Sequence, residues 1–402
     1  MLNQPERRQC IARLFQSKFG DEPELWARAP GRVDLMGSHT DYNLGHVLTV
    51  PINRDTWMAA RERSDGTVRV YSANLHALDH FSLASIEKSE INSWSNYVRG
   101  VASVLGEQGL RLTGFDAVVH STVPLESGLS SSAALECALA VVFRELGGWD
   151  LKPEEMAQLC QKAENQFVGV KCGILDQCSS CLGKEGCTLL LDCRSLSTRT
   201  IPIAQRIQIV ICDTRSRRRL SEGEYALRRR QCEEAAASLG ASALRDVTLE
   251  QLDARVNDLP ADILKRARFI VTENDRVLRM AEALAAGDNA AIGVLCAESF
   301  EGARDLYEIC SPVMLVMREA MVSAPGAIGA RQAGAGFGGC MVALVEAEHT
   351  EEFRRAVSEA YQKATGVQPE TYPVEAAAGA GLIDWCEGLP QQTEGLLGTE
   401  AR

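Results

Sequence analysis

One stretch of the chain, residues 123–134, has the composition of a turn between a strand and a helix. It reads VPLESGLSSSAA, follows an apolar run at 115–123, and precedes apolar residues at helical spacing: Leu135, Ala138, Leu139, Val142 and Phe143. Such a turn leaves backbone N–H groups unpaired at the positive end of a helix dipole, where a phosphate binds well. An ordinary serine N-cap is the alternative, and this stretch alone does not exclude it.

The composition is that of a large soluble protein. With 402 residues the chain has room for two domains, and 46% hydrophobic and 24% charged residues are ordinary for a globular fold. A net charge of −12 argues against nucleic acid or an anionic membrane as the main partner. No apolar run is long enough to cross a bilayer, and the first ten residues are too polar for a secretory signal. We therefore expect a cytoplasmic protein.

The chain contains fourteen cysteines, and five of them lie close together in sequence: Cys172, Cys178, Cys181, Cys187 and Cys193. Cys178 and Cys181 form a C-x-x-C, but a zinc site needs a second pair at similar spacing, and there is none. A cytosolic chain of this length needs no disulfides. We expect free thiols that pack as small hydrophobic groups.

The remaining pattern predicts a mixed succession of helices and strands. Gly20 ends a first helix, and Asp65-Gly66 turns a hairpin. Thr272-x-x-Asp275 resembles a capping box that opens another helix. Residues 28–43 are unusually polar for a core strand. We expect strands at 47–52, 57–70 and 207–212, helices at 93–106, 153–168 and 220–239, domains at 1–200 and 201–382, and a loose tail at 383–402.

A glycine-dense segment at 334–339 satisfies G-x-G-x-x-G. A dinucleotide site requires this motif to open a helix, whereas residues 340–345 form a β-type apolar run. A protein-kinase loop is excluded because no H-R-D or D-F-G follows. The segment instead predicts a hairpin whose backbone approaches a ligand closely.

Three segments together resemble, in order and spacing, the motifs of the GHMP small-molecule kinases, and within them the galactokinases: GRVDLMGSHTDYN at 31–43, PLESGLSSSAA at 124–134 and GAGFGG at 334–339. Shorter matches occur at 94–100, 163–169, 172–177, 224–234 and 271–276, so the resemblance covers residues 10–345 with few gaps. H-T-D-Y-N at 39–43 is the most family-specific part, since the other two motifs indicate only the superfamily.

The resemblance implies a two-lobed α+β fold with ATP and a sugar bound in the cleft between the lobes. It also implies an ATP-dependent sugar-1-kinase that converts D-galactose to galactose 1-phosphate. Asp176 matches the family's catalytic aspartate, which accepts the proton of the anomeric hydroxyl, and Arg32 matches the arginine beside it. Ser132 and Glu164 match the ligands of Mg²⁺, an ion that prefers hard oxygen donors.

Binding roles are implied in the same way. Trp94 and Tyr97 match positions that stack on adenine. The matched sugar contacts are Ser38, His39, Thr40, Asp41, Tyr225 and Gly336. The matched phosphate loop comprises Glu126, Ser127, Gly128, Leu129, Ser130, Ser131 and Ser132.

Two positions depart from the family pattern. Ser38 replaces a glutamate that contacts the C6 hydroxyl of the sugar, which leaves open a weaker contact to galactose or a substrate altered at C6, either L-arabinose or galacturonate. Residues 376–379 read AAAG where the family usually has a serine-aspartate pair, and the sequence offers no physical account of this change.

A different class of function is a catalytically dead relative that senses a sugar or a nucleotide. Such a protein would usually have lost one of the reacting groups. The four residues that match them are all present: Asp176, Arg32, Ser132 and Glu164. The sequence therefore favours an active kinase.

Overall fold

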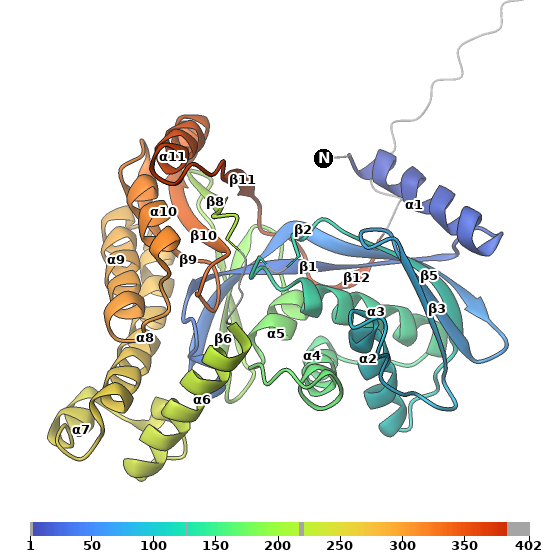
Figure 1. Ribbon diagram of the computed structural model, residues 1–402, viewed down its shortest axis with the longest axis horizontal. Coiled ribbons are helices and arrows are strands. Elements are labelled where there is room, and N and C mark those ends of the chain that lie inside the picture. The colour runs from blue at the N-terminus through green and yellow to red at the C-terminus, as the bar shows by residue number, and fades with distance from the viewer. Residues whose placement is uncertain (1–2, 126, 217–220, 384–402) are drawn as a thin grey trace, which may run out of the picture.

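The computed structural model describes residues 3–125, 127–216 and 221–383, and within these the side chains of residues 221 and 222 are left aside. Glu126 of the predicted phosphate loop and residues 384–402 of the predicted tail lie outside the described residues. The described chain forms two lobes, each built on its own sheet (Figure 1).

The sheet of the first lobe has eight strands in the described part of the chain, in the order β12-β1-β2-β5-β3-β4, while β6 pairs with β2 and with β7. All of its pairings are antiparallel except that of β3 with β5. The strands are β1 (Leu25–Met36), β2 (His46–Arg63), β3 (Thr67–Ser72), β4 (Ala77–Ser82), β5 (Gly114–Ser121), β6 (Cys187–Asp192), β7 (Thr198–Pro202) and β12 (Gly381–Leu382).

Helices cover both faces of this sheet. Figure 1 shows one helix, α1 (Gln4–Phe19), on one face and the other helices of the lobe on the opposite face. The main apolar core of the lobe lies between the sheet and this second group, because the helices turn their buried stripes toward the strands. The group comprises α2 (Ser95–Glu107), α3 (Ser131–Gly147), α4 (Pro153–Lys162), the π-helical turn η2 (Ala163–Val168) and α5 (Leu175–Leu182).

The second lobe has a four-stranded antiparallel sheet in the order β11-β8-β10-β9, formed by β8 (Ile207–Asp213), β9 (Ala327–Gln332), β10 (Cys340–Glu346) and β11 (Glu370–Val374). Helices α9 (Asn289–Asp305) and α10 (Pro312–Val322) pack on β9, and α11 (Thr350–Thr365) packs on β11. The elements not yet named are α6 (Ser221–Ser238), η3 (Leu244–Asp246), α7 (Leu249–Ala254), α8 (Ala261–Ala286) and η4 (Ala347–His349). The short helix η1 (Asp41–Asn43) lies in the turn between β1 and β2.

Several element predictions are confirmed. Helix α1 ends where Gly20 adopts a left-handed conformation with φ 82°. Asp65 and Gly66 connect β2 to β3, and the glycine-dense segment at 334–339 joins the antiparallel strands β9 and β10. The predicted helix at 153–168 is α4 continued by η2.

Two element predictions are wrong. Residues 47–52 and 57–63 belong to one continuous strand, β2, instead of two. Thr272 caps no helix, because α8 runs through it, and its hydroxyl donates to the backbone oxygen of Arg268 one turn earlier. A threonine and an aspartate three residues apart also occur inside helices, so the local pattern was not sufficient.

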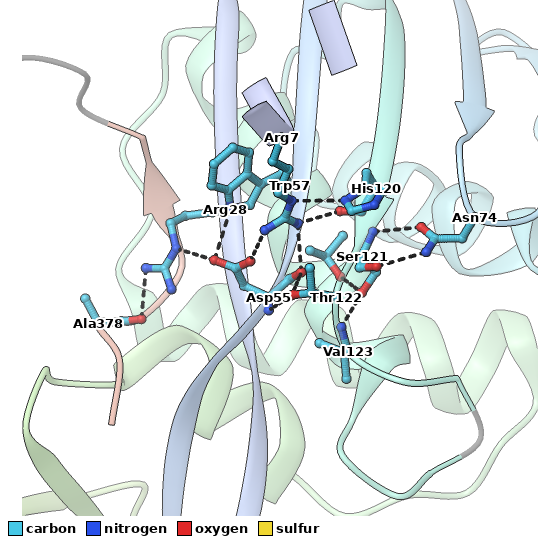
Figure 2. A network of polar contacts seen from close by, with 11 residues as sticks. Arg7, Arg28, Asp55, Trp57, Asn74, His120, Ser121, Thr122, Val123 and Ala378 are labelled. Carbon is cyan, nitrogen blue, oxygen red and sulfur yellow. Dashed lines mark hydrogen bonds and ion pairs between the residues drawn. The ribbon is translucent and has the colours of Figure 1, made fainter. Parts of the chain in front are cut away.

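A buried polar network explains both the length of β2 and the polar character of β1 (Figure 2). The Asp55 carboxylate accepts hydrogen bonds from Arg7 of α1 (2.5 Å), Arg28 of β1 (3.0 Å) and the indole of Trp57 (3.0 Å). Arg7 also donates to His120 of β5, and burial together with the Arg7 charge lowers the pKa of His120 to about 4. The network therefore holds α1 against three strands of the sheet.

The segment at 376–379 is held mainly through its backbone. Arg28 donates to the backbone oxygens of Ala378 (3.1 Å) and Gly379 (3.3 Å), as Figure 2 shows for Ala378. A Cβ on Gly379 would lie 2.3 Å from the backbone oxygen of Cys181, so this position requires glycine. These contacts involve no side chain of residues 376–379, and the departure from the family pattern has no structural explanation.

The chain enters the second sheet at β8 and returns to the first sheet through β12. The predicted division at residue 200 falls inside β7 of the first sheet, shortly before β8 begins the second, and it stays a prediction. None of the helices in the described ranges is long and apolar enough to cross a membrane. The cysteines of the described residues are free thiols, and most are buried in the apolar clusters.

Candidate active site

A cavity of about 550 Å³ is lined by residues of both lobes. The first lobe contributes β1, the turn after it, the start of α3, the segment after η2 and the start of α5, while the second lobe contributes α6 and the glycine-dense hairpin. The lining residues predicted from the sequence are Arg32, His39, Asp41, Tyr97, Gly128, Ser130, Ser131, Ser132, Glu164, Asp176 and Tyr225.

The serine-rich turn lies at one end of the cavity. Helix α3 begins at Ser131, and Ser130 before it takes a left-handed conformation with φ 61° that a non-glycine residue seldom adopts. The Ser130 hydroxyl makes no N-cap bond and has no hydrogen-bond partner among the described residues. A plain serine cap does not account for this geometry. The start of α3 instead offers a positive dipole to the cavity, together with the Ser130 hydroxyl.

Arg32 and Asp176 form an ion pair in the middle of the cavity. The Arg32 guanidinium lies 2.6 Å from the Asp176 carboxylate and 3.1 Å from Asp34 on its own strand, and it also donates to the backbone oxygen of Gly128 (2.7 Å). Burial alone would lower the pKa of Arg32, but the charges of Asp176 and Asp34 raise it. Arg32 is therefore a permanent cation that connects Asp176 to the serine-rich turn.

Glu164 lies beside the first turn of α3. Its carboxyl group accepts hydrogen bonds from Gln177 (2.6 Å) and Cys172 (3.3 Å), and it also interacts with the Ser132 side chain. Burial and the nearby charge of Asp176 raise the pKa of Glu164 to about 7. Behind it, Glu136 is fully buried and receives a second bond from Gln177 (3.0 Å). Burial and the nearby charge of Glu164 raise the pKa of Glu136 well above its usual range.

The opposite end of the cavity is formed by His39, Asp41 and an aromatic cluster. The His39 ring has one nitrogen 2.9 Å from the Tyr42 hydroxyl and the other 2.9 Å from the backbone oxygen of Ala335. It lies 5.3 Å from the Tyr225 ring. Burial and the charge of Asp176 raise the pKa of Asp41 to about 7. A carboxylate and an imidazole against aromatic rings form a surface suited to a polyhydroxylated ligand.

Some predicted site residues do not line the cavity: Ser38, Thr40, Trp94, Ser127, Leu129 and Gly336. Thr40 is fully buried and donates to the backbone oxygens of Gly37 and His46. Ser127 donates to the backbone oxygen of Pro124 (2.8 Å) and accepts from the backbone of Cys340 (3.0 Å), so it joins the serine-rich turn to the glycine-dense hairpin. Thr40 and Ser127 therefore support the cavity wall without lining it.

Gly336 has φ 81°, and a Cβ there would meet the backbone oxygen of Ile309 at 2.7 Å. It allows the hairpin to turn so that Ala335 and Phe337 line the cavity. Trp94 precedes α2 and packs on the apolar core of the first lobe. Its predicted contact with adenine stays a prediction.

The sequence interpretation missed other lining residues: Asp34, Gly169, Val170, Lys171, Cys172, Gly173, Leu175, Ala226, Ala335 and Phe337. Asp34 could have been found, since it stands two residues after Arg32 on a strand and so faces the same side. Gly169, Cys172 and Gly173 lie in the short family matches at 163–169 and 172–177, but Val170 and Lys171 fall between these matches, in an irregular connection between η2 and α5 that carries no comparable signal.

Comparisons with known proteins agree with this geometry. The chain matches the family models described as GHMP kinases N terminal domain (residues 96–184), GHMP kinases C terminal (280–363) and galactokinase galactose-binding signature (13–62). It is 44% identical to a galactokinase of Roseiflexus over 92% of this chain and 95% of that protein. It is 41% identical to a galactokinase of Mannheimia succiniciproducens over 92% and 98%.

Comparison with solved structures also identifies galactokinase as a similar protein. The crystal structure of Lactococcus lactis galactokinase complexed with galactose superposes with a TM-score of 0.90 at 34% identity, covering 93% of this chain and 99% of that one. Mevalonate kinase of Methanococcus jannaschii has a TM-score of 0.62 at 16% identity, which shows a shared fold alone.

The two-lobed α+β fold is that of the GHMP kinases. These enzymes are phosphotransferases with ATP as co-substrate, and here the acceptor is a sugar hydroxyl. Within this superfamily, the chain belongs to the galactokinases.

Proposed function

We propose that the chain transfers the γ-phosphoryl group of ATP to the anomeric hydroxyl of D-galactose. The curated galactokinases that it resembles over most of its length support this substrate. The observation that carries the proposal is the Arg32–Asp176 pair, which lies in one cavity with the serine-rich start of α3 and with His39 and Asp41. A phosphate donor and a sugar acceptor on either side of this pair would meet at Asp176.

Asp176 is the group that takes the proton of the anomeric hydroxyl as the new bond to phosphorus forms. Its carboxylate is ion-paired with Arg32 at 2.6 Å and remains 27% exposed, so it is accessible to a substrate. Arg32 offsets negative charge on the reacting oxygens. Phosphoryl transfer requires positioning and charge neutralisation more than a covalent nucleophile, and this arrangement provides both.

Ser132 and Glu164 would hold Mg²⁺. Both line the cavity, their side chains interact with each other, and both offer the hard oxygen atoms that this ion prefers. The ion, when bound, neutralises charge on the β- and γ-phosphates. Gln177 and Cys172 donate to Glu164 and keep its carboxyl group turned toward the cavity. The residues present therefore fit the metal.

The remaining binding roles divide between the two ends of the cavity. Gly128, Ser130, Ser131 and Ser132 face the phosphates, and Tyr97 lies on the adenine side. Ser127, Leu129 and Trp94 support these positions from outside the cavity lining. His39, Asp41 and Tyr225 contact the sugar, and Asp41 accepts from its hydroxyl groups. We also propose that the enzyme works in the cytoplasm, where its co-substrate ATP is abundant.

A panel of sugars tests the proposal. The purified protein is incubated with ATP, Mg²⁺ and either D-galactose, L-arabinose or D-galacturonate, and ADP release and sugar phosphate are measured. We expect the highest kcat/KM with D-galactose. A preference for either of the other sugars would show that the substrate is altered at C6. No turnover with any of them, despite measurable ATP binding, would indicate a sensor instead of a kinase.

A further inference from the structure

The turn between β1 and β2, residues 37–46, carries His39 and Asp41 in a conformation that needs support. Gly37 has φ 98° and His39 has φ 69°, and a left-handed conformation costs free energy at a residue with a side chain. Within the turn, Thr40 donates to the backbone oxygen of Gly37 (2.7 Å) and Asn43 donates to that of His39 (2.9 Å). The Thr40 hydroxyl also lies 2.6 Å from the backbone oxygen of His46, so these local bonds reach the backbone oxygens at both ends of the turn but not the N–H groups of Gly37 and His46.

Helix α8 of the second lobe holds both ends. The backbone N–H of Gly37 donates to the Glu273 carboxylate (3.1 Å), and the backbone N–H of His46 donates to the side-chain oxygen of Asn274 (2.7 Å). One turn further along the helix, Val277 lies under the turn, since a Cβ on Gly37 would come within 2.8 Å of its methyl group. Two consecutive residues of one helix therefore fix the first and the last residue of the turn.

Glu273 is itself held in place by a buried cluster. Its side chain is fully buried and accepts from Arg276 (2.8 Å), Ser299 of α9 (2.8 Å) and Arg331 of β9 (3.1 Å). Burial would raise the pKa of Glu273, but the two arginines lower it. The same guanidinium nitrogen of Arg331 donates to the Ser38 hydroxyl (3.1 Å). Ser38 is 1% exposed, does not line the cavity, and is attached to this cluster.

We propose that Glu273 and Asn274 are positioning residues for sugar binding, and that Ser38 is the anchor of the turn to the second lobe. None of the three lines the cavity, so each acts on the sugar through His39 and Asp41. The proposal rests on the proposed function, because it takes these two residues as sugar contacts. It also means that Ser38 binds Arg331 instead of the C6 substituent of the substrate.

A purely structural role of the Glu273 cluster predicts a different result from a positioning role. If the cluster only joined the two lobes, loss of one of its hydrogen bonds would lower the thermal stability and leave the Michaelis constants unchanged. Positioning instead predicts a higher KM for galactose with an unchanged KM for ATP. Glu273 itself is a poor first target, since its removal leaves Arg276 and Arg331 buried without a counter-charge and the variant would be expected to unfold.

Asn274 gives the cleaner test. Asn274→Ala removes the acceptor of the His46 N–H, whereas Asn274→Asp keeps an oxygen at the same place. We expect the alanine variant to raise the KM for galactose about fivefold, the effect of one lost hydrogen bond, with the KM for ATP unchanged. The aspartate variant should stay within about twofold of wild type. An unchanged galactose KM in Asn274→Ala would overturn the proposal, as would an equal rise for ATP.

Two serines of the same cluster provide a matched pair. Ser38→Ala removes the hydroxyl that accepts from the Arg331 guanidinium, and Ser299→Ala removes the hydroxyl that donates to the Glu273 carboxylate. Only Ser38 belongs to the turn. We expect both variants to lower Tm, and only Ser38→Ala to raise the KM for galactose. A rise in KM of the same size in both variants, or in neither, would contradict the anchor role.

The same measurements separate this proposal from the proposed function. Should the wild-type protein phosphorylate no sugar of the panel, the proposed function fails, and galactose binding measured by calorimetry replaces KM in the comparison of the four variants. If the wild-type protein is active and the variants bind galactose as it does, only the positioning proposal fails.

Discussion

The phosphate end and the sugar end of the cavity are assembled in different ways. At the phosphate end, the serines that open α3, Glu164 and Asp176 all come from residues 130–176 of the first lobe. At the sugar end, the turn at 37–46 depends on partners in the second lobe, and Gly37 and the Glu273 that binds it are 236 residues apart in sequence. The side chains named at the first end thus all belong to one lobe, although Ser127 also bonds Cys340 of the second lobe, whereas the turn at the other end is bound at its first and last residues by the second lobe.

The difference has consequences for how each end responds to change. Under the proposed function, a mutation at the phosphate end removes a group that would contact ATP or its metal, and we expect its effect to stay local. The sugar end can be altered from outside the cavity, because its turn is held by Glu273, Asn274 and Arg331. Asp176 lies where the two ends meet, since it raises the pKa of both Glu164 and Asp41.

The largest expected effect is that of Asp176→Asn. This change would disable the reaction and would not distinguish the phosphate end from the sugar end. Asparagine keeps the shape but cannot accept the proton, so kcat should fall at least about a hundredfold. ATP binding, measured by calorimetry, should be nearly unchanged. Retention of more than about a tenth of the wild-type rate would show that Asp176 contributes less than ~1.4 kcal/mol to lowering the barrier, and its assigned role would be wrong.

A smaller effect, confined to the phosphate end, is expected for Glu164→Gln. A carboxamide is a poorer ligand than a carboxylate for Mg²⁺, so the Mg²⁺ concentration at half-maximal activity should rise about tenfold. The KM for galactose should stay the same. Glu185→Gln, an exposed position outside the cavity lining, is the control. An unchanged Mg²⁺ dependence would remove Glu164 from the metal site, and a changed galactose KM would show that the two ends are coupled.

An effect of similar size, which needs no mutation, is a pH dependence at the sugar end. Burial and the charges of Asp176 and Asp34 raise the pKa of Asp41 to about 7, while Arg32 opposes them. The ionised carboxylate is the stronger hydrogen-bond acceptor for a sugar hydroxyl. The KM for galactose should therefore be about tenfold higher at pH 6 than at pH 8, since a pH one unit below the pKa leaves about a tenth of the group ionised.

Asp41→Asn should give a higher but pH-independent galactose KM, and a wild-type KM that is flat between pH 6 and 8 would contradict the assignment.

The effect of Asp41 on the pH dependence of stability has the opposite sign to that of most aspartates. Because the folded-state pKa of Asp41 lies above the unfolded value, the folded protein binds its proton more tightly. Asp41 therefore lowers the free energy of unfolding as the pH rises from about 4 to about 7.

Most of the regular structure could be predicted from the sequence, and the two errors have a common cause. The residues at 53–56 favour a break between two strands, yet β2 runs through them because Asp55 is bound by Arg7, Arg28 and Trp57 from three elements. Thr272 and Asp275 resemble a helix start, yet they lie inside α8. In both places long-range packing overrides a local preference, and local patterns carry no information about it.

The sequence by itself determined the strand, serine-rich turn and helix start at 115–143, the glycine-dense hairpin at 334–339 and the family to which the chain belongs. Glycine conformations, helix ends and apolar periodicity depend on neighbours along the chain, so they are readable from it. Only the tertiary structure decided where Ser38 points and what supports His39 and Asp41. Those contacts exist because α8 and β9 pack against the turn between β1 and β2, and residues so far apart meet only when both lobes have folded.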